Sequence, residues 1–281
     1  MSSDAVIEAK NLSHVYSNGV VALNNVNITI RRGEFVALIG HNGSGKTTLA
    51  KHINGLLKPT SGQIIVHGID TREASVADLA KKVGYVFQNP DHQLCMKTVW
   101  EELAFGPRNL GTPEDEVKQV VDEILRLFGL EHYRDVHPFL LSRADRLRVA
   151  LCSVLTMRPE TLVVDEPTTG QDMRQSYEVM EILKKLHKEG RTVVFITHNM
   201  RLVAEYAERC IIMKDGKVFI DKPTREALTD FEKLRQAQLK PPQVTILSAR
   251  LANIGFEKPA LSVGEFVENV KNLLNNKHKS L

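Results

Sequence analysis

Apolar and polar residues alternate over the first forty positions of the chain. Between residues 5 and 39 the alternation is interrupted by two turn sequences, Ser17-Asn18-Gly19 and Arg31-Arg32-Gly33, and each separates two strand-like runs. The third run, 35–39, is apolar throughout, as expected for a central strand that is buried on both faces. The pattern predicts three strands, then a glycine-rich turn and a helix that ends near Leu57.

The spacing becomes helical over residues 98–158. Apolar residues recur there every three or four positions, and Gly111-Thr112-Pro113 interrupts the run. We expect Pro113 to be the first residue of the helix that follows, because proline has the backbone geometry that a helix start requires. The segment is therefore predicted to form a helical subdomain.

Strands and helices alternate after residue 160. The pattern predicts strands at 161–165 and 192–197, helices at 173–188 and 201–206, and a hairpin that turns at Asp215-Gly216. Alternation of this kind is typical of an α/β fold with a mostly parallel sheet.

The tail of the chain has a different pattern. Pro241-Pro242 separates a charged segment from two amphipathic helical patterns, whose apolar stripes lie at 247–254 and 263–274. We divide the chain into a main domain, 1–229, and a small C-terminal helical appendage, 230–281. The pattern alone is compatible both with a cap on the main domain and with a module for association.

Composition excludes several classes of protein. Of the 281 residues, 42% are hydrophobic and 25% charged, which is ordinary for a soluble globular protein. A net charge of +3 without a stripe of basic and aromatic residues does not indicate nucleic-acid binding. No apolar run approaches the roughly 20 residues of a membrane helix, and the first residues lack the pattern of a signal peptide. We expect no nucleic-acid partner, and any role at a membrane to depend on another protein.

The three cysteines, Cys95, Cys152 and Cys210, are far apart in the sequence. An odd, scattered set argues against a disulfide framework and suits a reducing compartment. No two have the spacing of metal ligands, so we expect all three to be packing residues.

The strongest chemical motif follows the third strand. Residues 40–47 fit G-x-x-x-x-G-K-[ST] between a buried strand and a helix, which is the context that a phosphate-binding loop requires. Glycines let backbone N–H groups approach phosphates, and the helix N-terminus favours negative charge. Lys46 is expected to reach the β- and γ-phosphates and the Thr47 hydroxyl to hold Mg²⁺. The nucleotide contacts assigned to this loop are Gly40, His41, Asn42, Gly43, Ser44, Gly45, Lys46, Thr47 and Thr48.

Two acidic residues end the predicted strand 161–165. Asp165 and Glu166 follow an apolar run, and open α/β sheets bind ligands at the carboxyl ends of their strands. We expect Asp165 to hold Mg²⁺ through water, and Glu166 to act as the general base for an attacking water. The alternative is that both are solvated turn residues.

Two further polar residues also follow predicted strands. His198 comes directly after 192–197, and Gln88 after the strand-like run 83–87. A lone histidine is more often structural, but this one shares a sheet edge with the two acids, which favours a γ-phosphate contact. Gln88 is a candidate for contact with the metal or with water, and by itself is a weak signal.

In this order the motifs resemble those of the ATP-binding-cassette (ABC) ATPases over about residues 5–225. The resemblance adds Tyr16, which falls where the family stacks an aromatic ring on adenine, and the segment 169–172, which falls where a loop crosses between paired subunits. It implies a P-loop ABC ATPase domain of the α/β class, with a mostly parallel sheet core, an antiparallel β subdomain and a helical subdomain. It also implies ATP and Mg²⁺ as cofactors, with Glu166, His198 and Gln88 as catalytic residues.

Three segments are similar to the ATPases of energy-coupling-factor (ECF) transporters, which import vitamins or transition-metal ions: 40–46, 88–94 and 104–111. Tail segments 239–243 and 262–266 are similar to the C-terminal dimerisation region of that group. The resemblance implies a pair of ATPase subunits, peripheral to the cytoplasmic face of the membrane. These subunits would grip the coupling helices of a membrane scaffold protein near 89–94. A separate membrane subunit binds the substrate.

The resemblance fails in part at Leu141-Ser142-Arg143-Ala144-Asp145. The family has Leu-Ser-Gly-Gly-Gln there, a helix N-terminus that contacts the γ-phosphate of the ATP held by the partner subunit. Ser142 is retained and is expected to contact the partner's ATP, although it would also serve as an ordinary N-cap. The Cβ atoms at 143 and 144 hinder close backbone approach, and Asp145 adds negative charge. We therefore expect a heterodimer with an ATPase whose signature is intact.

Three other functions are compatible with parts of the sequence. The first is an ATPase of another ABC importer type, against which segment 89–94 and the tail argue. The second is a soluble ATP-dependent clamp, against which the single cassette without a coiled-coil insertion or basic stripe argues. The third is a subunit that only binds ATP, which the retained Glu166 and His198 disfavour.

Overall fold

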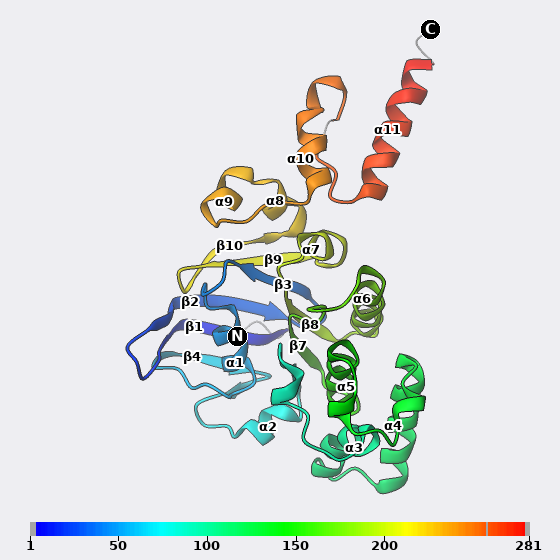
Figure 1. The fold of residues 1–281 in the computed structure, drawn as a ribbon. Coiled ribbons are helices and arrows are strands. Elements are labelled where there is room, and N and C mark those ends of the chain that lie inside the picture. The colour runs from blue at the N-terminus through cyan, green and yellow to red at the C-terminus, as the bar shows by residue number, and fades with distance from the viewer. Residues whose placement is uncertain (1–3, 257, 279–281) are drawn as a thin grey trace.

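A computed structural model describes residues 4–256 and 258–278, and within them helices surround two β-sheets (Figure 1). The smaller sheet is antiparallel, with strand order β2-β1-β4-β5. Its strands are β1 (Ala5–Val15), β2 (Val21–Arg31), β4 (Ser61–Val66) and β5 (Ile69–Asp70). The first two predicted strands are thus confirmed, and they pair with each other as a hairpin.

The larger sheet is the mostly parallel sheet that the sequence predicts. Its order is β10-β9-β3-β8-β7-β6, and only β10 is antiparallel to its neighbour. The strands are β3 (Phe35–Gly40), β6 (Val83–Val86), β7 (Thr161–Asp165), β8 (Thr192–Ile196), β9 (Arg209–Lys214) and β10 (Lys217–Pro223). All residues of β3, β6, β7 and β8 are buried, as expected for parallel strands covered on both faces.

Helices cover both faces of this sheet, and three of them form a separate group at one end (Figure 1). The helices of that group are α3 (Val99–Asn109), α4 (Glu114–Phe128) and α5 (Arg143–Leu155), as predicted for the helical subdomain. The other helices that precede β9 are α1 (Lys46–Ile53), α2 (Val76–Ala80), α6 (Met173–Lys188) and α7 (Met200–Tyr206).

Two predicted helix ends were wrong. Helix α1 ends at Ile53 rather than near Leu57, because Gly55 adopts a left-handed conformation with φ +75° that breaks the helix. Pro113 is not the first helical residue but the N-cap of α4, since its ψ of 142° is extended. Both ends are set by backbone conformation, which apolar periodicity does not reveal.

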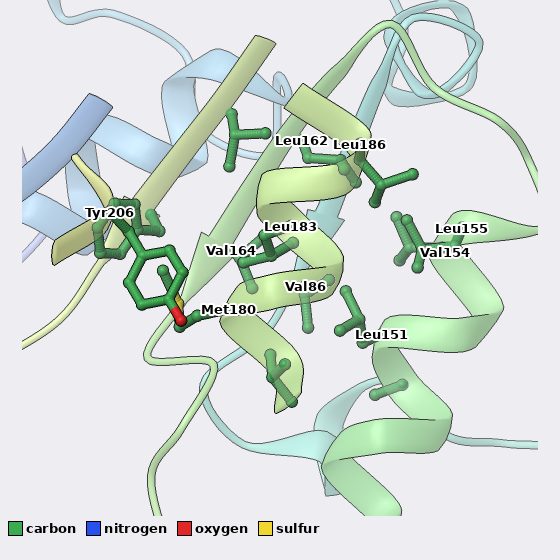
Figure 2. Close-up of a cluster of buried hydrophobic side chains, with 14 of the residues drawn as sticks. Val86, Leu151, Val154, Leu155, Leu162, Val164, Met180, Leu183, Leu186 and Tyr206 are labelled. Carbon is green, nitrogen blue, oxygen red and sulfur yellow. The ribbon is translucent and has the colours of Figure 1, made fainter. Parts of the chain in front are cut away.

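The core consists of two clusters on opposite faces of the larger sheet. Phe35, Ala37 and Ile39 of β3 belong to the cluster beneath α3 to α6, while Val36 and Leu38 belong to the cluster that faces α1 and the smaller sheet. This division follows from the alternation of side chains along a strand. Figure 2 shows part of the first cluster, where side chains of β7 meet those of α5 and α6.

The C-terminal helices are α8 (Thr224–Thr229), α9 (Phe231–Gln236), α10 (Gln243–Arg250) and α11 (Val263–His278). Leu234 of α9 and the adjacent Ala237 are fully buried in the first cluster. Helices α10 and α11 instead extend away from the rest of the chain (Figure 1).

The expectation for the cysteines holds for two of the three. Cys152 and Cys210 are buried, but Cys95 is exposed, so the packing role assigned to it was wrong. Cys95 lies in the loop that follows the 3₁₀ turn Pro90–His92, and its backbone N–H donates to Glu102. None of the helices in the described residues is both long and apolar enough to cross a bilayer.

Candidate nucleotide-binding site

A cavity of about 510 Å³ lies at the carboxyl ends of β3, β7 and β8. Most of the predicted site residues line it, together with four apolar residues that the sequence did not single out. The lining residues are Tyr16, Val20, Val21, Ala22, Asn42, Gly43, Gly45, Lys46, Thr47, Thr48, Gln88, Asp165, Glu166, Ile196 and His198. Gly40, His41 and Ser44 belong to the same loop without lining the cavity, and Ser142 lies elsewhere, at the start of α5.

The loop between β3 and α1 requires glycine at its end. Gly45 has φ +102°, a left-handed conformation that side chains disfavour. A Cβ atom there would also lie 2.6 Å from the carbonyl oxygen of Ala22. The fold therefore permits only glycine at the position where the loop turns into the helix, and this leaves the backbone open to a ligand.

The Lys46 ammonium is held inside this loop. Its Nζ donates to the carbonyl oxygens of Gly40 at 2.9 Å and His41 at 3.0 Å. Burial lowers the pKa of Lys46, while the nearby Glu166 and Asp165 oppose that shift. A phosphate in the cavity could replace the two carbonyls as acceptor without any change in the position of the helix.

Asp165 and Thr47 form a pair that fits a divalent cation. The Thr47 hydroxyl donates to Asp165 Oδ2 at 2.9 Å, and the Tyr85 hydroxyl donates to the same oxygen at 3.4 Å. The other carboxylate oxygen, Oδ1, is buried without a hydrogen-bond partner among the described residues, and burial raises the pKa of Asp165. An orphaned carboxylate oxygen beside a hydroxyl is an oxygen-donor set suited to Mg²⁺, and Gln88 lines the same cavity.

Glu166 and His198 lie next to each other in the lining of the cavity. His198 Nε2 lies 3.1 Å from Glu166 Oε1. Burial, and secondarily the charge of Asp165, raises the pKa of Glu166 to about 7. Burial, and then the charge of Lys46, lowers the pKa of His198. A carboxyl group that titrates near neutral pH beside a neutral imidazole is suited to accept a proton from water.

The end of the cavity beside Tyr16, where the base of a nucleotide would lie, is called the base end, and its lining is mostly apolar. Tyr16 follows β1, and its hydroxyl lies 3.1 Å from the Thr48 hydroxyl oxygen on α1. Val20, Val21 and Ala22 continue the wall. Neither Tyr85 nor these three residues were predicted, because each lies in a strand pattern that carries no chemical motif.

Ser142 is engaged within its own helix. Its hydroxyl accepts from Asp145 N at 3.1 Å and donates to Asp145 Oδ2 at 2.8 Å. Arg148 lies 3.4 Å from the other oxygen of that carboxylate. The N-cap expected for Ser142 is therefore present, whereas its contact with a partner's ATP stays a prediction.

Comparison with known proteins places this geometry in a family. The family described as "ABC transporter" matches residues 23–169. The energy-coupling factor transporter ATP-binding protein EcfA2 of Clostridium perfringens is 42% identical over 259 residues, which cover 89% of this chain and 91% of the relative. The chain belongs to the ABC transporter family of ATPases. Within it, the chain groups with the ECF transporter ATP-binding proteins.

Other relatives of this ABC protein support the same family assignment. A putative ABC transporter ATP-binding protein of Caldanaerobacter subterraneus is 47% identical over 268 residues, which cover 95% of this chain but 46% of the relative. The chain thus spans less than half the length of the first curated relatives it matches. Among solved structures, cbiO1 from Clostridium perfringens, part of the transporter complex cbiONQ, matches with a TM-score of 0.73 and 36% identity over 88% of this chain and 100% of that one. These matches confirm the ABC ATPase fold.

Proposed function

We propose that this ABC protein binds MgATP in the cavity and hydrolyses it to power an ECF importer for vitamins or transition-metal ions. One arrangement of side chains carries the proposal. Glu166, whose pKa burial raises to about 7, lies 3.1 Å from His198 and close to the loop that holds Lys46. The ECF relatives that are aligned along nearly their whole length support the importer type.

The proposed roles follow from the positions of the side chains. Lys46 and the loop N–H groups bind the phosphates, and the Tyr16 ring stacks on adenine. Thr47, Gln88 and Asp165 hold Mg²⁺, which when bound neutralises charge on the β- and γ-phosphates. The Glu166 carboxylate accepts the proton of the attacking water, and His198 contacts the γ-phosphate. For the ATP bound by the partner subunit, Ser142 is the one contact residue that we propose.

The Lys46→Ala variant tests the nucleotide site. We expect the affinity for MgATP to fall roughly tenfold to hundredfold, since a hydrogen bond to a charged group contributes about 1.5–3 kcal/mol. Equilibrium dialysis with labelled ATP measures this directly. Lys51→Ala, on the same helix but outside the cavity lining, is the matched control and should bind as wild type does. Equal affinity in all three proteins would contradict the proposal.

We propose that a groove separate from the ATP cavity receives a coupling helix of the membrane scaffold protein. Its volume is about 360 Å³, and apolar residues of α2, α3 and α5 dominate its lining, among them the half-exposed Phe105. Gln93, from the segment expected near the scaffold, lines the groove and donates to the carbonyl of Ala150 at 2.7 Å. Tyr85 also lines it and reaches Asp165 with its hydroxyl, which supports communication between the groove and the ATP cavity.

The appendage, residues 230–281, is proposed to be an association module that joins this chain to a second ATPase subunit. Leu247 of α10 is 47% exposed and Val263 of α11 is 56% exposed. Both line a groove of about 630 Å³ between these helices and α7. Apolar side chains that line an exposed groove favour contact with another protein over a cap on the main domain. Through these partners the chain would sit at the cytoplasmic face of the membrane.

Leu247→Asp tests the association module. We expect sedimentation velocity at high protein concentration to show self-association of the wild type that is lost in the variant, because a buried unpaired charge opposes the contact. Leu127→Asp, on the exposed side of α4, is the control. Self-association that survives Leu247→Asp would argue against this surface.

A further inference from the structure

Two buried histidines lie behind the base end of the nucleotide cavity. His14 on β1 is 8% exposed and His52 on α1 is 0% exposed, and their ring centroids are 4.8 Å apart at an interplanar angle of 76°. The His14 ring also meets the Tyr16 ring edge-on, at 4.7 Å and 86°. Three rings thus run in series from α1 to the wall of the cavity.

Hydrogen bonds determine which nitrogen of each ring carries the proton. His14 Nδ1 donates to the carbonyl of Lys58 at 3.1 Å, and His52 Nδ1 donates to the carbonyl of Thr48 at 2.7 Å, since a carbonyl can only accept. In both rings Nε2 is buried and has no hydrogen-bond partner in the described part of the chain. In each ring Nδ1 therefore carries a proton, and Nε2 has no partner to which it could donate one.

The pair is enclosed by uncharged groups. The Tyr16 ring and the Lys58 carbonyl contact His14, and among the described residues no carboxylate forms a salt bridge with either ring. Burial is the largest influence on the pKa of His52 and lowers it, the hydrogen bond to the Thr48 carbonyl opposes that shift, and the neighbouring His14 adds to it. Burial therefore favours the neutral form of the His52 ring.

The pair holds Tyr16 from two directions. The His14 ring packs against the Tyr16 ring, while Thr48, whose carbonyl accepts from His52, contacts the Tyr16 hydroxyl through its own side chain. Thr48 also belongs to the helix that begins at the phosphate loop. The two histidines therefore connect the position of the Tyr16 ring to the position of the loop.

We propose that His14 and His52 are positioning residues that hold Tyr16 for the base of an adenine nucleotide. The inference rests on the proposed nucleotide site. Without the His14 ring the Tyr16 ring loses its support, so binding of the base weakens and binding of the phosphates does not.

The test compares ADP with inorganic pyrophosphate, which lacks the base. Isothermal titration calorimetry gives both dissociation constants at pH 7.5. His14→Asn keeps a donor for the Lys58 carbonyl but removes the ring, and it should weaken ADP binding roughly fivefold, as expected for loss of an aromatic contact. Pyrophosphate binding should not change. His14→Phe keeps a ring against Tyr16, so it should bind ADP nearly as wild type does.

Two controls complete the test. His132→Asn, an exposed histidine beside Tyr133, should behave as wild type. Thermal unfolding verifies that each variant is folded.

The outcomes separate the inference from the proposed function. If wild type binds neither ligand at pH 7.5, the proposed nucleotide site fails. If wild type binds both, and His14→Asn weakens them equally or not at all, the histidines do not position Tyr16 and the inference is overturned while the site stands. The same holds if His14→Phe loses as much ADP affinity as His14→Asn.

Discussion

Replacement of Arg143, Ala144 and Asp145 by glycine, glycine and glutamine should raise the steady-state ATPase rate of the purified chain about hundredfold, the effect expected for one well-placed donor to a transition-state oxygen. The wild-type chain, paired with itself, should be nearly inactive. In the structure the Ser142 hydroxyl donates to Asp145 Oδ2 at 2.8 Å, so it is directed to a carboxylate of its own helix. That carboxylate would also repel a phosphate at the helix N-terminus.

The position of the Arg143 side chain is the reason to replace Arg143 together with Asp145. The Arg143 side chain lies over the loop that includes Gly170, since a Cβ atom on Gly170 would be 3.9 Å from Arg143 Cδ. That loop, 169–172, is the one expected to cross between paired subunits. Two glycines would remove this cover and let the N–H groups approach the phosphate closely.

Ser142→Ala in the repaired chain is the matched control, and it should remove most of the gain if the serine contacts the phosphate. Assays that couple ADP release to NADH oxidation measure all three proteins. If wild type is already fast and the repair changes nothing, the segment 141–145 works as it stands. The proposal of a heterodimer with an intact partner then loses its main support.

The parts of the fold that the sequence predicts are those set by local pattern. β3, β7 and β8 are continuous apolar runs bounded by turn residues, and helix α6 was predicted with both of its ends. Its start is encoded locally, because Asp172 and Gln175 form a capping box. The end of α1 was not predicted, because it depends on the left-handed conformation of Gly55.

The residues of the candidate site also differ in whether local sequence marks them. Lys46, Thr47, Asp165 and Glu166 were singled out because a motif or a strand end marks them. His14 and His52 were not found, since they are 38 positions apart and only the packing of β1 against α1 brings their rings together. Tyr85 reaches Asp165 across 80 positions of sequence. Contacts of this kind are products of tertiary structure and leave no periodic pattern.

In the chain with the repaired signature, Glu166→Gln should lower kcat about 10²–10⁴-fold, the usual contribution of a general base, and should leave ATP binding intact. Glutamine has nearly the same shape but cannot accept the proton of the attacking water. ATP should therefore hold the paired chains together, which sedimentation velocity detects as a dimer that persists in the presence of MgATP. Glu189→Gln, exposed at the end of α6, is the control and should hydrolyse ATP at the unchanged rate.

The pH profile distinguishes loss of a base from loss of structure. Burial raises the pKa of Glu166 to about 7, so the carboxyl is protonated and inactive as a base below that value. The rate of the repaired chain should therefore rise as pH passes from 6 to 8. His198 does not reverse this trend, because burial lowers its pKa and so moves its titration away from neutral pH. In Glu166→Gln the rise near pH 7 should disappear along with the activity. Undiminished turnover in that variant, or a rise near pH 7 that persists in it, would show that another group accepts the proton.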